Sequence, residues 1–387
     1  MILDALIVGA GPAGNLLAYH LAKAGLKVQL CEKKVLPRYK ACGGGVSRKA
    51  LQQIPFDVSP VIEFPASGGV VSYQGKPMLT TFTETPFASL VNRDQFDHFL
   101  CQKAISAGAT LLENCKITGH TALPDSVEVQ TTRRNFRTRL LIGADGVNSR
   151  VAKSAQLMAN RPSGIALEAE IQVSAKVLGA QGAFATFDFG AIPHGYGWVF
   201  PKRDHFSVGI FGAHTRTIPK IKDILLNYLA AQPALGDYQM MSLYGHRIPL
   251  GGTPQPLHNA STLLVGDAAN LADAFLGEGI YYALWSANLA ADEILKQWDT
   301  PRLNLESYTQ QVNATILPHL QYARKIADLI YPFSRLSTHL LKKSAYLQKM
   351  VFGVISGEST YQQLWQAITT RSPKILWDVL RYGGKSE

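Results

Sequence analysis

A glycine fingerprint near the N-terminus is the clearest chemical signal in the sequence. Gly9, Gly11 and Gly14 form a G-x-G-x-x-G motif directly after the apolar run 2–8. In such a motif the first glycine permits a tight turn, the second lets the backbone approach a pyrophosphate, and the third lets helix and strand pack closely. The N–H groups at the start of the following helix then face the phosphates. The motif predicts binding of a dinucleotide.

The segments around this motif complete a βαβ unit. A helical pattern runs over 15–24, and a second strand over 26–31 ends on Glu32. An acid at this distance from the fingerprint meets the ribose hydroxyls of a bound nucleotide. Because its carboxylate repels a 2′-phosphate, the sequence disfavours NADP at this site. A lone G-x-G-x-x-G is weak evidence, but strand, helix, strand and acid in this order are specific.

Two further glycine–acid pairs follow apolar runs. Asp145 and Gly146 end one run, and Gly266 and Asp267 end another. Either pair alone is a common turn sequence. Together with the fingerprint they predict three strand ends that meet at one cofactor. The sequence contains no second G-x-G-x-x-G, so a nicotinamide donor would visit transiently, or electrons would come from another protein.

An arginine and an aromatic stripe are further candidates for binding residues, the arginine because its guanidinium can bind phosphate oxygen atoms. Arg93 precedes a Phe-rich helical segment that Asp94 is expected to cap. Tyr196, Trp198 and Phe200 alternate, so they share one face of a strand. An aromatic stripe of this kind either belongs to a hydrophobic core or lines an apolar pocket.

The combination of these motifs resembles the aromatic-hydroxylase-like class of FAD enzymes. Three segments narrow the resemblance to the geranylgeranyl reductase family: 37–47 (PRYKACGGGVS), 196–202 (YGWVFPK) and 277–283 (GEGIYYA). The similarity spans residues 1–295, and the Y-x-W-x-F-P-K segment is the most discriminating. The family implies reduced FAD that delivers hydride to isoprenoid double bonds, with NAD(P)H or another external electron donor.

The fingerprint and the resemblance together imply a set of cofactor-binding residues. The helix that begins near Gly279 would direct its N-terminus at the flavin and stabilise negative charge on the reduced ring. The full set is Gly9, Gly11, Ala13, Gly14, Glu32, Lys33, Cys42, Gly43, Gly44, Arg93, Asp145, Gly146, Gly266, Asp267, Gly277, Gly279 and Ile280.

The resemblance also suggests catalytic and substrate residues. Cys42 is either a small buried apolar residue or a thiol beside the flavin that donates or relays a proton. Tyr196, Trp198 and Phe200 are expected to line the isoprenoid pocket, where their rings would stabilise positive charge that develops on the alkene. Such charge matters because an isolated alkene is not activated for hydride attack. His194, His205, His214 and His246 have no metal-binding spacing, so we expect ordinary structural or surface histidines and no metal.

Two other functions fit the same fold class. One is a flavin-dependent monooxygenase or halogenase, which would use oxygen, and the other is a flavin-loaded electron-transfer module. The Cys42-Gly-Gly-Gly loop and the segment 196–202 favour the reductase.

The elements that position these residues predict an α/β fold. It combines a Rossmann-type FAD-binding domain, a β-rich substrate domain and a helical C-terminal region. The expected FAD-binding domain is discontinuous (1–60, 90–160 and 255–300), the substrate domain comprises 61–89 and 161–254, and the helical region is 301–387. Strands are expected over 165–173, 184–189, 195–201 and 206–212, and a helix over 218–231.

Composition narrows the partners and the compartment. The 387 residues carry 38 Lys+Arg and 28 Asp+Glu, a net charge of +10, and residues 316–387 contribute +6 of it on amphipathic helices. This basic region suggests peripheral contact with an acidic membrane surface, with a helical subdomain as the alternative. No nucleic-acid motif, signal peptide or membrane-spanning run is recognisable. Four cysteines without a C-x-x-C pair are typical of a reducing, cytoplasmic compartment.

Overall fold

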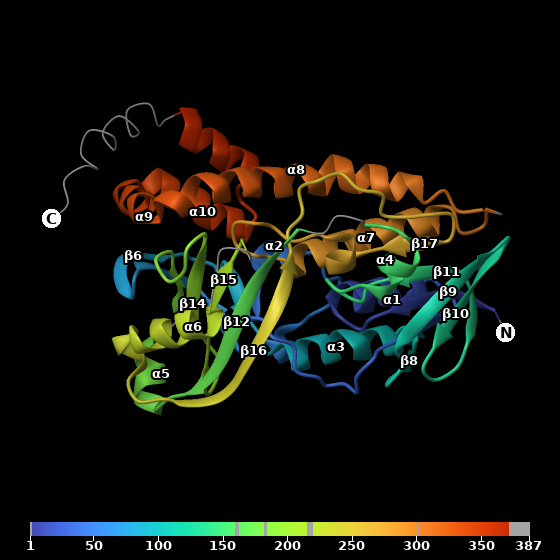
Figure 1. Ribbon diagram of the computed structural model, residues 1–387, viewed down its shortest axis with the longest axis horizontal. Helices are drawn as coiled ribbons and strands as arrows, with labels where there is room; N and C mark the ends of the chain where they lie inside the picture. The colour runs from blue at the N-terminus through green and yellow to red at the C-terminus, as the bar shows by residue number, and fades with distance from the viewer. Residues whose placement is uncertain (1, 159–161, 182–183, 215–219, 301, 371–387) are drawn as a thin grey trace.

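The computed structural model describes residues 2–158, 162–181, 184–214, 220–300 and 302–370. Two large β-sheets lie side by side along the molecule, and C-terminal helices cover both of them (Figure 1). The predicted α/β class, with a Rossmann-type domain and a helical C-terminal region, is confirmed.

The first sheet contains the nucleotide fingerprint. Its strands run in the order β8-β2-β1-β11-β10-β9, and β17 pairs with β11. The central strands are parallel and almost wholly buried, which explains why they are near-continuous apolar runs. The strands are β1 (Leu3–Val8), β2 (Val28–Cys31), β8 (Thr110–Leu112), β9 (Ile117–Leu123), β10 (Ser126–Thr131), β11 (Phe136–Gly143) and β17 (Thr262–Leu264).

Helices α1 (Pro12–Lys23), α3 (Arg93–Ser106) and α7 (Ile280–Lys296) pack beside this sheet. Helix α1 begins three residues earlier than the predicted 15–24, because the fixed φ of Pro12 suits the first helical turn. The expected cap by Asp94 is wrong. Asn92 holds the N-cap position of α3, and the Asp94 carboxylate instead accepts the N–H of Gln95 at 2.8 Å.

The second sheet has the order β16-β12-β15-β14-β13-β5-β6. Strands β14 (Gly195–Pro201) and β15 (Phe206–Gly212) have the predicted bounds, and β12 (Ser163–Gln172) and β13 (Phe184–Asp188) differ by one or two residues. Three strands of this second sheet were not predicted: β5 (Gly68–Tyr73), β6 (Lys76–Phe82) and β16 (Gln239–Pro249). β16 is long but mostly half-buried or exposed, and its apolar and polar residues do not alternate regularly.

A small third sheet has the order β3-β7-β4, and several short helices lie around the sheets. Its strands are β3 (Gly45–Ser47), β4 (Phe64–Ala66) and β7 (Ala88–Leu90). The short helices are α2 (Arg48–Leu51), α4 (Arg150–Ser154), α5 (Ala175–Gln181) and α6 (Ile221–Ala230). Helix α6 corresponds to the expected helix 218–231, of which 218–219 lie outside the described residues.

The C-terminal layer includes α8 (Glu306–Ile330), α9 (Ser334–Lys343) and α10 (Ala345–Ser356), and a further helical stretch continues to residue 370 (Figure 1). The apolar stripe of α8 is buried, including Leu320, Ala323 and Ile326. Among the described residues, no helix combines the length and the apolar character that crossing a bilayer requires.

Candidate active site

A cavity of about 750 Å³ lies between the two large sheets, at the carboxyl ends of β1 and β11. Ligands of open α/β sheets bind at this edge. The three glycine clusters line the cavity from one side, and the aromatic residues of β14 line it from the other. The cavity therefore joins a polar nucleotide end to an apolar end.

Each glycine of the fingerprint has a different structural role. Gly9 has φ +106°, and a methyl group there would lie 2.4 Å from the carbonyl oxygen of Ala144. A methyl group at Gly14 would lie 2.0 Å from the carbonyl oxygen of Gly9. Gly11 meets nothing within 4 Å and borders the cavity together with Ala13. Its backbone is therefore open to a ligand, as phosphate binding requires.

Two helix N-termini border the same cavity. Neither α1 nor α7 receives a side-chain cap from any residue that the structure describes. Gly277, with φ +65°, and Gly279 bring the chain to Ile280, the first residue of α7, and all three border the cavity. N–H groups at uncapped helix starts favour anionic ligand atoms.

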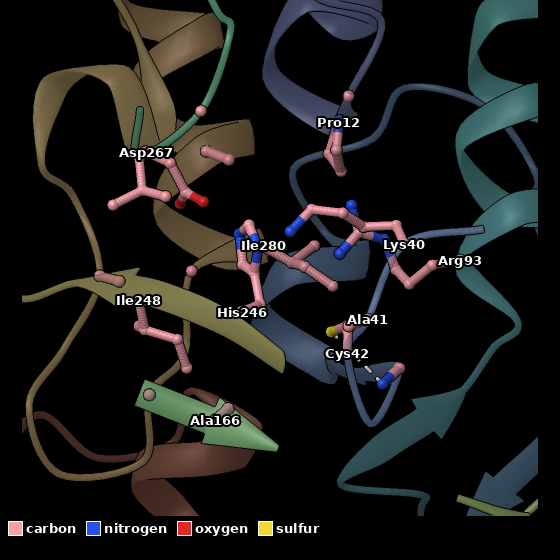
Figure 2. A pocket seen from close by; sticks show the side chains of 18 of the residues that line it. Pro12, Lys40, Ala41, Cys42, Arg93, Ala166, His246, Ile248, Asp267 and Ile280 are labelled. Carbon is pink, nitrogen blue, oxygen red and sulfur yellow. Dashed lines mark hydrogen bonds between the residues drawn. The ribbon is translucent and has the colours of Figure 1, made fainter. Parts of the chain in front are cut away.

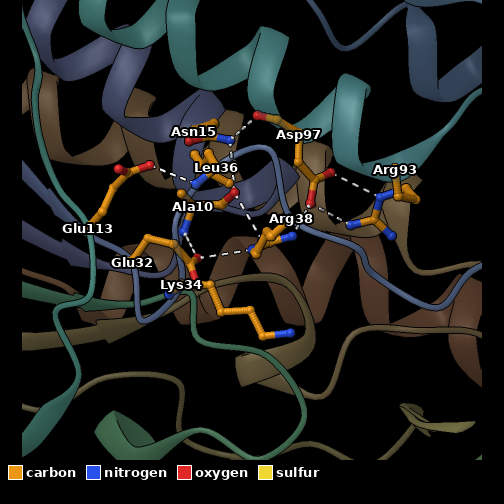
Figure 3. A network of polar contacts seen from close by, with 9 residues as sticks. All are labelled: Ala10, Asn15, Glu32, Lys34, Leu36, Arg38, Arg93, Asp97 and Glu113. Carbon is orange, nitrogen blue, oxygen red and sulfur yellow. Dashed lines mark hydrogen bonds and ion pairs between the residues drawn. The ribbon is translucent and has the colours of Figure 1, made fainter. Parts of the chain in front are cut away.

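Glu32 belongs to a buried polar network beneath the nucleotide end (Figure 3). Its carboxylate accepts the N–H of Ala10 at 3.0 Å and lies 3.4 Å from Nε of Arg38. Arg38 also donates to the fully buried Asp97 at 3.0 Å. Asp97 accepts two more hydrogen bonds from Arg93, from Nε at 2.9 Å and from Nη2 at 3.1 Å. One carboxylate thus fixes two arginines that border the cavity.

The Asp145 carboxylate is hydrogen-bonded to nearby residues of the protein. It accepts hydrogen bonds from the hydroxyl of Ser149 at 2.5 Å and from the N–H of Arg150 at 2.6 Å, at the start of α4. Gly146, with φ +81°, follows it in the cavity wall. The predicted pair therefore contributes mainly backbone to the site, with its carboxylate already used.

Asp267 faces a cationic group across the cavity (Figure 2). Burial raises the pKa of Asp267, and the charges of Lys40 and Arg93 oppose that rise. The side chains of Lys40 and Arg93 lie side by side opposite Asp267 (Figure 2). Burial, followed by the charge of Arg93, lowers the pKa of Lys40 to about 8.

Sequence reasoning missed Lys40, Arg38 and His246 as residues of the site. Lys40 and Arg38 lie in the segment 37–47. Two basic side chains so soon after the βαβ unit in the sequence could have indicated a binding site for the anionic part of the cofactor. His246 was expected to be an ordinary structural or surface residue, but it lies on β16 and borders the cavity (Figure 2). Burial and the nearby cations, Lys40 first, lower its pKa to about 3, so the imidazole is neutral. Its Nε2 has no hydrogen-bond partner among the described residues.

The Cys42 loop is held by two buried ionisable side chains, Glu168 and Lys202. Glu168 accepts the N–H of Cys42 at 2.6 Å and the hydroxyl of Tyr39 at 3.1 Å. The ammonium group of Lys202 donates to the carbonyl oxygens of Gly43 and Val91, both at 2.8 Å. Burial raises the pKa of Glu168 and lowers that of Lys202. Lys202, which ends the Y-x-W-x-F-P-K segment, therefore fixes the position of the glycine loop through these hydrogen bonds.

The aromatic stripe forms the wall behind this loop. Tyr196, Trp198 and Phe200 are at most 7% exposed and all border the cavity. A methyl group at Gly43 would lie 2.8 Å from Nε1 of Trp198, so only glycine lets the loop approach the ring. The hydroxyl of Tyr196 donates to the carbonyl oxygen of Leu276 at 2.7 Å, which ties the wall to the segment before α7.

The residues present fit an FAD molecule. Open backbone at Gly11 and an uncapped α1 suit the pyrophosphate, and the uncapped α7 suits the electron-rich edge of a flavin. Lys33 and Gly44 also border the cavity, as predicted for the cofactor site. Gly266 does not border it: the residue is buried, and its N–H donates to the hydroxyl of Ser286 at 3.0 Å.

Comparison with known families and proteins identifies the chain. Residues 69–311 match a family of FAD-binding domains, and residues 7–71 match NAD(P)-binding Rossmann-like domains. Digeranylgeranylglycerophospholipid reductase 1 of Methanothermobacter thermautotrophicus is 31% identical over 347 residues, which are 86% of this chain and 87% of that protein. The chain belongs to the geranylgeranyl reductase family. It is an FAD-dependent oxidoreductase, as the sequence predicts.

Two further proteins are similar to the chain. The chloroplastic geranylgeranyl diphosphate reductase of Nicotiana tabacum is 27% identical over 370 residues, 89% of this chain and 79% of that protein. A crystal structure of a geranylgeranyl bacteriochlorophyll reductase-like protein from Thermoplasma acidophilum has a TM-score of 0.76 and 23% identity. It covers 98% of this chain and 99% of that one, and it shows that the fold is shared along the whole length.

Proposed function

We propose that this enzyme reduces carbon–carbon double bonds in an isoprenoid chain, of the geranylgeranyl or polyprenyl type. The observation that carries the proposal is the aromatic wall of Tyr196, Trp198 and Phe200, which continues directly from the cradle for FAD. The relatives in Methanothermobacter and Nicotiana are named as reductases of geranylgeranyl compounds. Reduced FAD, when bound, supplies the hydride.

The chain's own residues would orient the alkene and handle the proton. The aromatic faces exclude water and stabilise positive charge on the chain while the proton is added. We place the proton source at Cys42, whose thiol borders the cavity where the loop meets the aromatic wall. Arg93, Lys40 and Asp267 would hold the polar part of the cofactor, and NAD(P)H or another external donor would reduce it.

A lipid substrate also implies where the enzyme works. Long isoprenoid chains are held in membranes, so we propose peripheral contact of this protein with a membrane surface from the cytoplasmic side. The basic character of its C-terminal helices supports this contact.

Product mass spectrometry tests the proposed reaction. Chemically reduced enzyme is incubated with geranylgeranyl lipids, geranylgeranyl diphosphate and polyprenyl quinones, with and without oxygen. A gain of about two mass units per double bond without oxygen is expected, since two hydrogens are added. An oxygen-dependent gain of about sixteen would instead indicate the monooxygenase, and a halogenated product with halide and oxygen would indicate the halogenase.

A further inference from the structure

Helix α9 has an exposed face of a single charge sign. Arg335, His339, Lys342 and Lys343 follow helical spacing and are all exposed, whereas Leu341 is buried. Residues 329–357 contain Arg335, Lys342, Lys343 and Lys349 and no Asp or Glu. Surfaces of soluble domains usually mix both signs. A cationic face without acids is complementary to an anionic surface.

Large aromatic side chains accompany these charges. Phe333 is 59% exposed just before α9, and Tyr346 is 40% exposed in the first turn of α10. Helix α9 packs against β6, whose last residue, Phe82, is 67% exposed. Figure 1 shows α9, α10 and β6 together at one end of the molecule. Exposed aromatic rings beside basic residues are typical of proteins that lie in the interface of a bilayer.

Helix α10 connects this face with the cavity. Ile355, near its C-terminal end, borders the cavity, and Phe352 packs on Phe87, another cavity residue, with ring centroids 5.3 Å apart. Tyr346 and Lys349 of the same helix are exposed. One helix therefore has its inner side at the apolar end of the cavity and its outer side on the cationic face.

We propose that this face docks on a bilayer that contains anionic phospholipid, so that the substrate chain reaches the cavity beside α10. The docking face consists of Phe82, Phe333, Arg335, Lys342, Lys343, Tyr346 and Lys349. The lipid substrate of the proposed function is the reason for docking, but binding to vesicles does not require turnover.

Vesicle partitioning of the full-length protein tests this surface. Vesicles of phosphatidylcholine with phosphatidylglycerol should bind the protein at low salt, and vesicles of pure phosphatidylcholine should bind it far less. Since each basic residue near the membrane contributes to partitioning, Arg335→Gln/Lys342→Gln/Lys343→Gln should lower it by about a hundredfold. Glutamine is a good helix former, so α9 should persist. Phe333→Ser/Tyr346→Ser should weaken binding even at high salt, because its contribution is not electrostatic.

The matched control removes three charges elsewhere. Lys27, Arg133 and Lys153 are exposed and lie outside both the cavity and the docking face, so Lys27→Gln/Arg133→Gln/Lys153→Gln should retain most binding. Equal loss in both triple variants, or no binding of the wild type to anionic vesicles, would overturn the proposal. So would a protein dimer that the α9 substitutions dissociate without vesicles.

Activity on a short, detergent-dispersed isoprenoid separates docking from the reaction. The α9 triple variant should match the wild type on this substrate and fall behind it on substrate held in vesicles. Vesicle binding without reduction of any isoprenoid would leave docking standing and refute the proposed function. Reduction of dispersed substrate without vesicle binding would refute docking alone.

Discussion

The backbone N–H of Cys42 donates to the carboxylate of Glu168 at 2.6 Å, one residue before the carbonyl group that Lys202 holds. The other carboxylate oxygen accepts the hydroxyl of Ser207 at 2.6 Å, and that hydroxyl in turn accepts Nε1–H of Trp198 at 3.2 Å. Glu168 therefore fixes the glycine loop and the aromatic wall at once. It is 2% exposed, so these hydrogen bonds are shielded from water.

Replacing Glu168 with glutamine should loosen the loop. An amide offers one acceptor oxygen where the carboxylate offers two, so the hydrogen bonds from the Cys42 N–H and from the Ser207 hydroxyl cannot both be kept as they are. We expect a loss of about 1–3 kcal/mol in the free energy of unfolding, measured by denaturant titration. Glu128→Gln, on an exposed part of β10, is the matched control and should change stability little.

The same variant should change the pH dependence of stability. Burial, followed by the charge of Glu170, raises the pKa of Glu168 above its ordinary value of 4.5. Its stabilising contribution is therefore complete below 4.5 and is lost as the pH rises through the folded-state pKa. Glu168→Gln should lack this decrease. An unchanged pH profile would contradict the assignment.

Lys40 should make FAD affinity depend on pH. Its pKa of about 8 means that the ammonium form, which attracts the pyrophosphate, is lost as the pH rises above that value. FAD binding should raise this pKa, so affinity should fall as the pH rises above about 8. Lys40→Met should weaken FAD binding by about 2 kcal/mol, roughly thirtyfold, and remove this pH dependence.

Fluorescence titration of the apoprotein with FAD measures both effects of the Lys40 substitution. Lys27→Met, at an exposed position outside the cavity, should leave affinity and its pH dependence unchanged. If Lys40→Met binds FAD as the wild type does at pH 7, Lys40 does not contact the cofactor.

Features of the fold and the site can be predicted from the sequence when they depend on residues that are neighbours in the chain. The βαβ unit and strands β14 and β15 are recognisable because glycine spacing and apolar runs are properties of neighbouring residues. The contacts of Glu168 with Cys42 and of Asp97 with Arg38 join residues 126 and 59 positions apart. Such pairs depend on how sheets pack, which no local pattern encodes. His246 was missed for the same reason, because the pairing of β16 with β12 is what places its residues at the cavity.

Cys42→Ala tests whether the thiol supplies the proton. If it does, reduction of the alkene should slow by about a hundredfold or more, since general acid catalysis contributes about 10²–10⁴. FAD binding and the flavin spectrum should stay nearly unchanged. Cys101→Ala is the matched control, because Cys101 is buried and outside the cavity. Equal rates for both variants would exclude the thiol as proton donor.

Trp198→Leu tests whether the aromatic wall contacts the substrate or belongs only to the core. Trp198 is 4% exposed and borders the cavity, and its ring should contact the isoprenoid and stabilise positive charge as the proton is added. Leucine keeps an apolar surface but lacks the π face, so kcat should fall by about tenfold while KM changes less. Trp298→Leu is the matched control, because Trp298 packs against Arg139 away from the cavity. A fall in thermal stability with kcat and KM unaltered would show that Trp198 is a core residue, and a rise in KM alone would limit it to binding the chain.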